Sequence, residues 1–179
     1  VLVLLTFGME TTLFRFANKE DEKPDTVFST ATGVVCTLSV VFLAFMFSFL
    51  TPISESLGYA DHPDYLLMMA TVVVLDSIQA MPFSYLRFQK RPLKFASLKL
   101  LFIFFNIALN VLYFVVLGKT EVYYVFCINL WCTGLITFFF IPDFFKVKWH
   151  FDFALLKRML SYSWPILVLG VAGVLNQTA

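Results

Sequence analysis

The stretch VFSTATGVVCTLSVVFLAFMFSFL, residues Val27 to Leu50, decides the fold class, because it contains no charged residue. A bilayer core of ~30 Å is crossed by about 20 apolar residues in a helix that rises 1.5 Å per residue. The stretch therefore predicts a transmembrane helix. A helix is required, since an open sheet edge in hydrocarbon would leave backbone groups unpaired, and the alternation typical of a transmembrane barrel is absent.

Three further runs of this size follow, and two apolar runs that look truncated lie at the two ends of the sequence. The end runs begin or end inside apolar sequence, so we expect each to be a part of a transmembrane helix in a longer protein. The predicted fold class is an all-α, polytopic transmembrane bundle of about six spans, four complete and two truncated. The spans are predicted at residues 1–17, 27–50, 65–88, 93–117, 122–141 and 159–179.

The composition agrees with lipid as the main solvent. Hydrophobic residues make up 60% of the 179 residues, charged residues only 14%, and there are 23 phenylalanines. An ordinary soluble domain is much more polar. The three cysteines, Cys36, Cys127 and Cys132, lie in apolar runs without metal-ligand or disulfide spacing, so we interpret them as packing residues.

The basic residues sort the connecting loops into two groups. Of the 13 basic residues, 12 lie in or beside the first, third and fifth connections, whereas the fourth has only Lys119 and the second has none. By the positive-inside rule the odd-numbered connections are cytoplasmic, and the first span runs inward. The 12 residues are Arg15, Lys19, Lys23, Arg87, Lys90, Arg91, Lys94, Lys99, Lys146, Lys148, Lys157 and Arg158.

The fifth connection, residues 143–158, is predicted to be a cytoplasmic linker at the membrane interface. It mixes aromatic with basic residues, and Asp152 is suited to cap a helix that carries Leu156, Met159 and Leu160 on one face. A surface helix and an ordinary linker with aromatic anchors both agree with this pattern.

Charged groups within the spans are the sharpest functional signals, because each costs roughly 2.5 to 3.5 kcal/mol at a helix centre unless it faces a partner or a wet cavity. Asp76 lies in the middle of its span, with Gln79 one turn later and Pro82 beyond, where it interrupts the backbone hydrogen bonds. Asp76 must face inward. It is either a cation, proton or sugar site or an interhelical contact that fixes packing.

Glu10 and Arg15 lie in the first span at a spacing of five, which does not stack them on one helix face, so we expect partners on other helices. Glu10 is deep enough to face a lumen, whereas Arg15 can also extend to the headgroups. Arg87 belongs to a basic cluster with Lys90, Arg91 and Lys94. Such a cluster can attract a diphosphate, but it also serves as a topology signal.

Asn176 and Gln177 follow Pro165, Gly170 and Gly173 in the last run, where bending or close approach can expose polar groups to a cavity. Amides in other spans are more often contacts between helices. The two histidines lie in connections on opposite sides, and there is no glycine-rich phosphate loop. We therefore expect no catalytic residues, no metal, no cofactor and no enzyme activity.

Three stretches together resemble bacterial polysaccharide biosynthesis proteins of the oligosaccharide flippase type, in the multidrug/oligosaccharidyl-lipid/polysaccharide exporter superfamily. They are GMETTLFRFAN (Gly8–Asn18), LDSIQAMPFSYLRFQKRPLKFASLKL (Leu75–Leu100) and LSYSWPILVLGVAGVLNQTA (Leu160–Ala179). The resemblance implies two lobes around a central cavity. Residues 1–142 would then be most of the first lobe, 143–158 the link between lobes, and 159–179 the start of the second lobe.

The resemblance also implies a function, which is movement of an undecaprenyl-diphosphate-linked oligosaccharide from the cytoplasmic to the periplasmic leaflet of the cell inner membrane, in polysaccharide or lipopolysaccharide biosynthesis. Expected partners are this substrate, membrane lipids and envelope-polysaccharide assembly proteins, and not nucleic acid. Arg15 and Arg87 are suited to the diphosphate. The residues suited to sugars or to ion coupling are Glu10, Asp76, Gln79, Asn176 and Gln177.

Two other functions stay open. One is a cation-coupled multidrug antiporter of the same superfamily, with Asp76 as the coupling carboxylate. The other is an integral-membrane glycosyltransferase or acyltransferase of envelope synthesis, which would need acidic or histidine catalytic residues at a membrane face. The basic inner surface favours an anionic lipid substrate.

Overall fold

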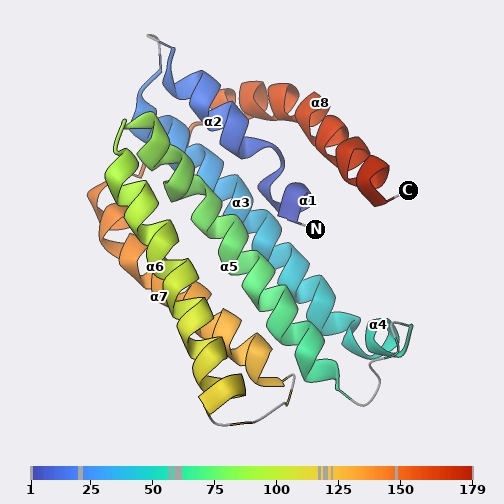
Figure 1. Ribbon diagram of the computed structural model, residues 1–179. Coiled ribbons are helices and arrows are strands. Elements are labelled where there is room, and N and C mark those ends of the chain that lie inside the picture. The colour runs from blue at the N-terminus through green and yellow to red at the C-terminus, as the bar shows by residue number, and fades with distance from the viewer. Residues whose placement is uncertain are drawn as a thin grey trace.

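The structure, a computed structural model, consists of helices joined by short connections (Figure 1). It describes residues 2–19, 22–56, 58, 62–116, 118, 121, 123–147 and 149–178, and for residues 143, 146, 175, 177 and 178 it describes the backbone alone. In chain order the helices are α1 (Leu2–Thr6), α2 (Met9–Ala17), α3 (Pro24–Ser48), α4 (Leu50–Ser56), α5 (Pro63–Phe88), α6 (Pro92–Val111) with a π-helical turn η1 (Leu112–Val116), α7 (Tyr123–Lys146) and α8 (Phe153–Thr178).

Four of these helices are long and apolar enough to cross a membrane, at Pro24–Ser48, Pro63–Phe88, Pro92–Val116 and Tyr123–Pro142. They coincide with the four complete spans predicted from the sequence. Their outer faces carry exposed aromatic and aliphatic side chains such as Phe104, Trp131 and Phe138, which are 68%, 77% and 70% exposed. So many exposed apolar side chains on neighbouring helices mark a lipid-facing surface. The predicted all-α transmembrane bundle is confirmed, and the chain is a membrane protein.

Prolines help to set where the spans begin. Pro24, Pro63 and Pro92 each stand in the first turn of a long helix. Proline suits this position, because the missing N–H has no partner there in any helix and the fixed φ is already helical. Pro82 lies inside α5, yet the helix continues through it to Phe88. Neighbouring helices make such an interior proline tolerable in a membrane bundle.

The first apolar run differs from the prediction of one unbroken span. It forms two short helices, α1 and α2, because Phe7 and Gly8 adopt left-handed backbone conformations with φ of 50° and 66°. Two consecutive left-handed residues cannot continue a right-handed helix. The break also lets α8 approach closely, since a Cβ atom on Gly8 would lie 2.9 Å from Cγ2 of Ile166.

The predicted linker at residues 143–158 is helical at both of its ends. Helix α7 extends to Lys146, and α8 begins at Phe153 and runs unbroken into the last apolar run. The cap predicted at Asp152 is present, because its Oδ1 accepts hydrogen bonds from the backbone N–H groups of Ala154 (2.7 Å) and Leu155 (3.2 Å). These bonds hold the pKa of the Asp152 carboxyl below its usual value.

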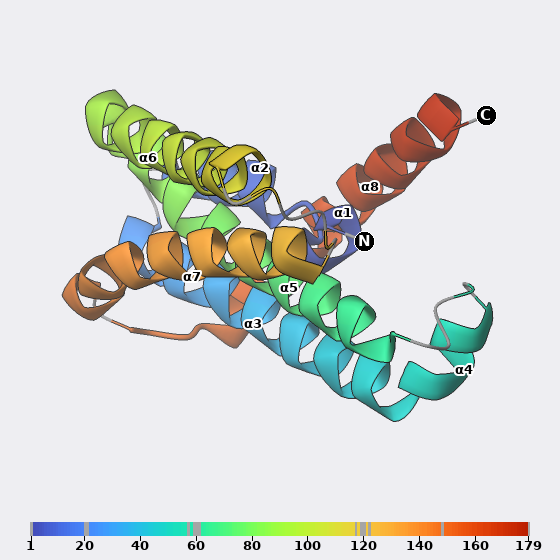
Figure 2. The same cartoon turned by 60° about the horizontal axis from the view of Figure 1, so that its bottom comes forward.

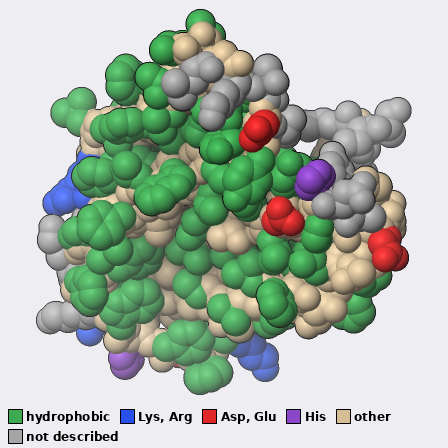
Figure 3. Space-filling model, turned by 90° about the horizontal axis from the view of Figure 1, so that it is seen from below, with side chains coloured by type: hydrophobic (Ala, Val, Ile, Leu, Met, Phe, Trp, Pro, Cys, Tyr) green, Lys and Arg blue, Asp and Glu red, His purple; other side chains and the backbone are tan. Residues whose placement is uncertain are grey.

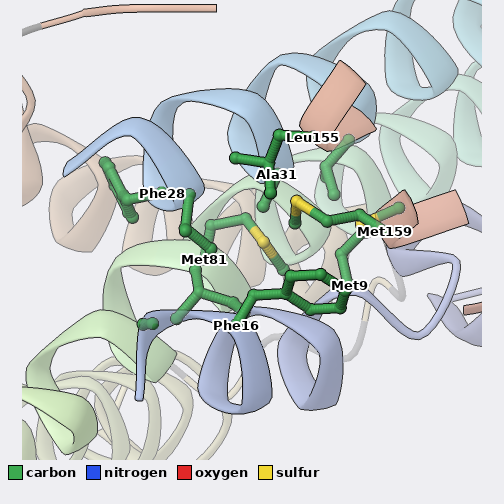
Figure 4. Packing of buried hydrophobic residues seen from close by; sticks show 11 residues of the cluster. Met9, Phe16, Phe28, Ala31, Met81, Leu155 and Met159 are labelled. Carbon is green, nitrogen blue, oxygen red and sulfur yellow. The ribbon is translucent and has the colours of Figure 1, made fainter. Parts of the chain in front are cut away.

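Helix α5 is central to the bundle and packs against α3, α7, α2, α1 and α6. Its Met81 joins a buried cluster that also contains Met9 and Phe16 of α2, Phe28 of α3 and Met159 of α8 (Figure 4). This cluster ties the first half of α8 to the bundle. Figures 1 and 2 show the C-terminal half of α8 projecting away from the four long helices.

The odd-numbered connections meet at one end of the bundle. Arg158 of α8 forms an ion pair of 2.7 Å with Glu22 of the first connection, and the Tyr85 hydroxyl near the end of α5 donates to Asp25 at the start of α3. At the opposite end, Tyr65 stacks on His62 and lies beside Tyr123 of α7. Figure 3 looks onto that opposite end, where acidic side chains face the viewer and basic ones appear only near the margin.

Candidate functional site

A cavity of about 310 Å³ lies between α2, α5, α6 and α7 and contains four charged side chains. One stripe of α5 forms its longest wall, with Asp76, Ala80, Phe83 and Arg87 at helical spacings of four, three and four. Residues three and four apart share one face of a helix. The central helix therefore presents a carboxylate near its middle and a guanidinium near its end to the same space.

The opposite wall comes from α6 by the same geometry. Phe95, Lys99 and Phe102 line the cavity at spacings of four and three. The Lys99 ammonium lies 4.4 Å from the centre of the Phe83 ring, within cation–π range. Lys99 and the Asp76 carboxylate line the same cavity. A cation on α6 thus faces the carboxylate of α5 across the cavity.

Glu10 of α2 completes a second charge pair. Its Oε2 lies 3.2 Å from Nη2 of Arg87, and the Ser84 hydroxyl bridges them, because it donates to Glu10 over 3.4 Å and accepts from Arg87 over 3.0 Å. The Glu10 and Arg87 side chains are 39% and 49% exposed. The pair is therefore accessible from the cavity, and the expectation that Glu10 finds its partner on another helix is met.

Gln79 lines the same cavity but is buried, with its amide directed to α7. The Nε2 group donates to the backbone oxygen of Thr133 (2.9 Å) and to the Thr137 hydroxyl (2.8 Å). The Thr137 hydroxyl itself donates to the Thr133 oxygen. These bonds fix α7 against α5, so Gln79 makes the packing contact that polar residues often make between membrane helices.

The structure brings together Glu10, Asp76, Gln79 and Arg87 and leaves Arg15 and Asn176 apart from them. Arg15 is exposed, and its guanidinium lies 4.0 Å from the centre of the Tyr162 ring of α8. Asn176 is exposed in the C-terminal half of α8. The side chain of Gln177 lies outside the described part of the structure. Neither Arg15 nor Asn176 lines the cavity.

Lys99 is a functional candidate that reasoning from sequence missed. The basic residues around the third connection read as one topological cluster, although Lys99 stands seven residues inside α6, about 10 Å from the helix start. A signal was available in the flanking Phe95 and Phe102, which mark a helix stripe that contains Lys99. Among the described residues, no group of three or more histidine, cysteine, aspartate or glutamate side chains could hold a metal ion.

Comparison with known proteins gives the family. The model of the family described as "Polysaccharide biosynthesis protein" matches residues 1–179, the whole of the chain. No curated protein and no solved structure matches the chain. A match over the full length is enough to assign the family, and the three stretches that suggested it from sequence lie within the matched region. The chain belongs to the polysaccharide biosynthesis protein family, and it acts in polysaccharide biosynthesis as a membrane protein.

Proposed function

We propose that the protein moves a lipid-linked oligosaccharide across the cell inner membrane, from the cytoplasmic to the periplasmic leaflet, and that it is a transporter and not an enzyme. The observation that carries the proposal is the charged cavity among the membrane-spanning helices, in a chain of a polysaccharide biosynthesis family. Charges are costly inside a membrane, and where they line a cavity they mark a pathway for polar cargo.

The residues of the cavity match the polar parts of such a substrate. A diphosphate needs cations, and Arg87 and Lys99 both line the cavity. Arg87 offers a planar guanidinium that can donate two parallel hydrogen bonds, and Lys99 offers a compact ammonium group. Sugar hydroxyl groups need hydrogen-bond acceptors, which Glu10 and Asp76 supply. The exposed apolar face of α6 beside this cavity suits the polyprenyl chain, which can stay in the hydrocarbon while the polar head enters the bundle.

The test is translocation of a fluorescent diphosphate-linked oligosaccharide lipid in proteoliposomes that contain the full-length protein. Arg87→Ala and Lys99→Ala should each slow translocation at least about tenfold, because each removes one charge-assisted contact with phosphate, worth roughly 1.5–3 kcal/mol. Lys157→Ala is the matched control, since Lys157 is an exposed cation on α8 that does not line the cavity. Equal rates in all three variants and the wild type would contradict the proposal.

A cation-coupled antiporter is the second candidate, favoured by the Asp76 carboxylate, which lines the cavity together with Lys99. In that case Asp76→Asn would abolish ion-driven export of a cationic drug, and the lipid-linked oligosaccharide would not move. Release of a transferred sugar or acyl product in the same vesicles would instead point to the transferase alternative.

A further inference from the structure

A second and larger cavity, of about 670 Å³, lies at the end of the bundle where the odd-numbered connections meet. It is separate from the charged cavity described above, with which it shares no lining residue. Its walls combine aromatic rings with charged groups, from the start of α3, the end of α5 and the connection before α8. Its lining includes Lys23, Asp25, Tyr85, Trp149 and His150.

The aromatic side of this cavity consists of packed rings. The Trp149 ring stacks on Phe144 at 6.1 Å with an interplanar angle of 14°, and its indole N–H donates to the backbone oxygen of Phe144 over 2.9 Å. Tyr85 packs on Phe28 with ring centres 4.6 Å apart. Trp149 nevertheless remains 55% exposed. A tryptophan that is fixed by two contacts and still half open presents a preformed flat surface to a ligand.

The polar side of the cavity supplies one strong acceptor and two donors. The Asp25 carboxylate is half-buried and is oriented by the Tyr85 hydroxyl, which donates to its Oδ1 over 2.6 Å. A carboxylate has two acceptor oxygens, so the second oxygen of Asp25 is left to accept a hydrogen bond from a ligand. Lys23 and His150 are exposed at the rim and can donate. A pyranose ring has C–H groups on its face and hydroxyl groups on its edge. Such a ring therefore suits a flat apolar surface beside a fixed carboxylate.

We propose that this cavity binds a sugar ring of the oligosaccharide at the side of the membrane where the basic connections lie. The assignment of the ligand as a saccharide rests on the proposed function. The other ligand suited to an interfacial aromatic site is the phosphate of a lipid headgroup. Lys23 of this cavity is exposed at the rim, so the charge held in the wall beside the aromatic rings is the Asp25 carboxylate. A carboxylate there repels an anion, whereas it accepts hydrogen bonds from neutral hydroxyl groups.

Binding is measured by saturation-transfer NMR with the full-length protein in nanodiscs. The ligand used is the free oligosaccharide released by mild acid from the lipid-linked pool of the producing cells. Sugar ring protons should receive saturation, and Trp149→Ala and Asp25→Asn should each weaken binding by about tenfold. Asp25→Asn keeps an acceptor for Tyr85 and so preserves the fold. Trp131→Ala, which removes an exposed tryptophan on the lipid face of α7, should leave the affinity unchanged.

Two outcomes would overturn the site. One is unchanged affinity in both Trp149→Ala and Asp25→Asn, and the other is displacement of the oligosaccharide by phosphatidylglycerol vesicles. Translocation by the wild type distinguishes a failure of the sugar site from a failure of the proposed function. If the lipid-linked substrate moves but neither variant alters binding, the site fails alone. If the free oligosaccharide binds as expected but its lipid-linked form does not move, the proposed function fails and the sugar site stands.

Discussion

The Glu10–Arg87 pair can hold α2 against α5 or can serve the cargo, and a double-mutant cycle separates these two roles. Both side chains are more than a third exposed, so water in the cavity screens their attraction. We expect a coupling free energy of about 0–1 kcal/mol between Glu10→Gln and Arg87→Gln, measured by unfolding of the full-length protein in detergent. Translocation should fall much more than stability in Arg87→Gln. A coupling of several kcal/mol with unchanged translocation would identify a packing contact.

The sequence was sufficient to select most of the polar residues of the charged cavity but not to show that they meet. Charge within a span is improbable without a partner, and this physical cost selects Glu10 and Asp76 without any structure. Arg87 lies on the same stripe of α5 as Asp76, and Gln79 lies beside that stripe. Arg15 was also selected, because from sequence alone a cation near a helix end can extend to the headgroups or into a cavity. Within the part of the chain that it describes, the structure shows neither a cavity contact nor an ion pair for Arg15 but places its guanidinium over the Tyr162 ring, a contact that the sequence did not predict.

At the level of elements, the break between α1 and α2 depends on Gly8. Its φ of 66° is unfavourable by roughly 1–2 kcal/mol for a residue with a Cβ atom, and that atom would also lie 2.9 Å from Ile166 of α8. Gly8→Ala should therefore lower the melting temperature of the full-length protein in detergent. Gly134→Ala is the matched control, because a Cβ atom there meets open space inside α7 and alanine favours the helix. A Gly8→Ala protein as stable as the wild type would show that the break does not need glycine.

The long spans were predictable because membrane thickness fixes their length, whereas the break was not. The run from Val1 to Ala17 is apolar throughout most of its length, and a single glycine does not by itself end a helix in a membrane. The break goes together with the close approach of α8, some 150 residues later in the chain. The Thr12 and Ser163 hydroxyls, only 2.6 Å apart, belong to the same contact. The pattern of residues within the first run cannot reveal a contact with a helix so far along the chain.

For the whole molecule, the alternation of basic connections predicts that the two ends of the bundle face different compartments. Single cysteines test this in a full-length protein whose native cysteines have been replaced, because Ser56 and Gln89 are both exposed and lie at opposite ends of α4–α5. Cysteine at Ser56 should react with a membrane-impermeant maleimide added to intact spheroplasts, and cysteine at Gln89 only after permeabilisation. One pair of labelled sites is enough to fix the orientation of the whole bundle. Contacts such as Arg158–Glu22 join the basic connections at one end, so these connections must share a compartment. Labelling of Gln89 and not Ser56 in intact cells would invert the orientation, and with it the direction of transport proposed for the charged cavity.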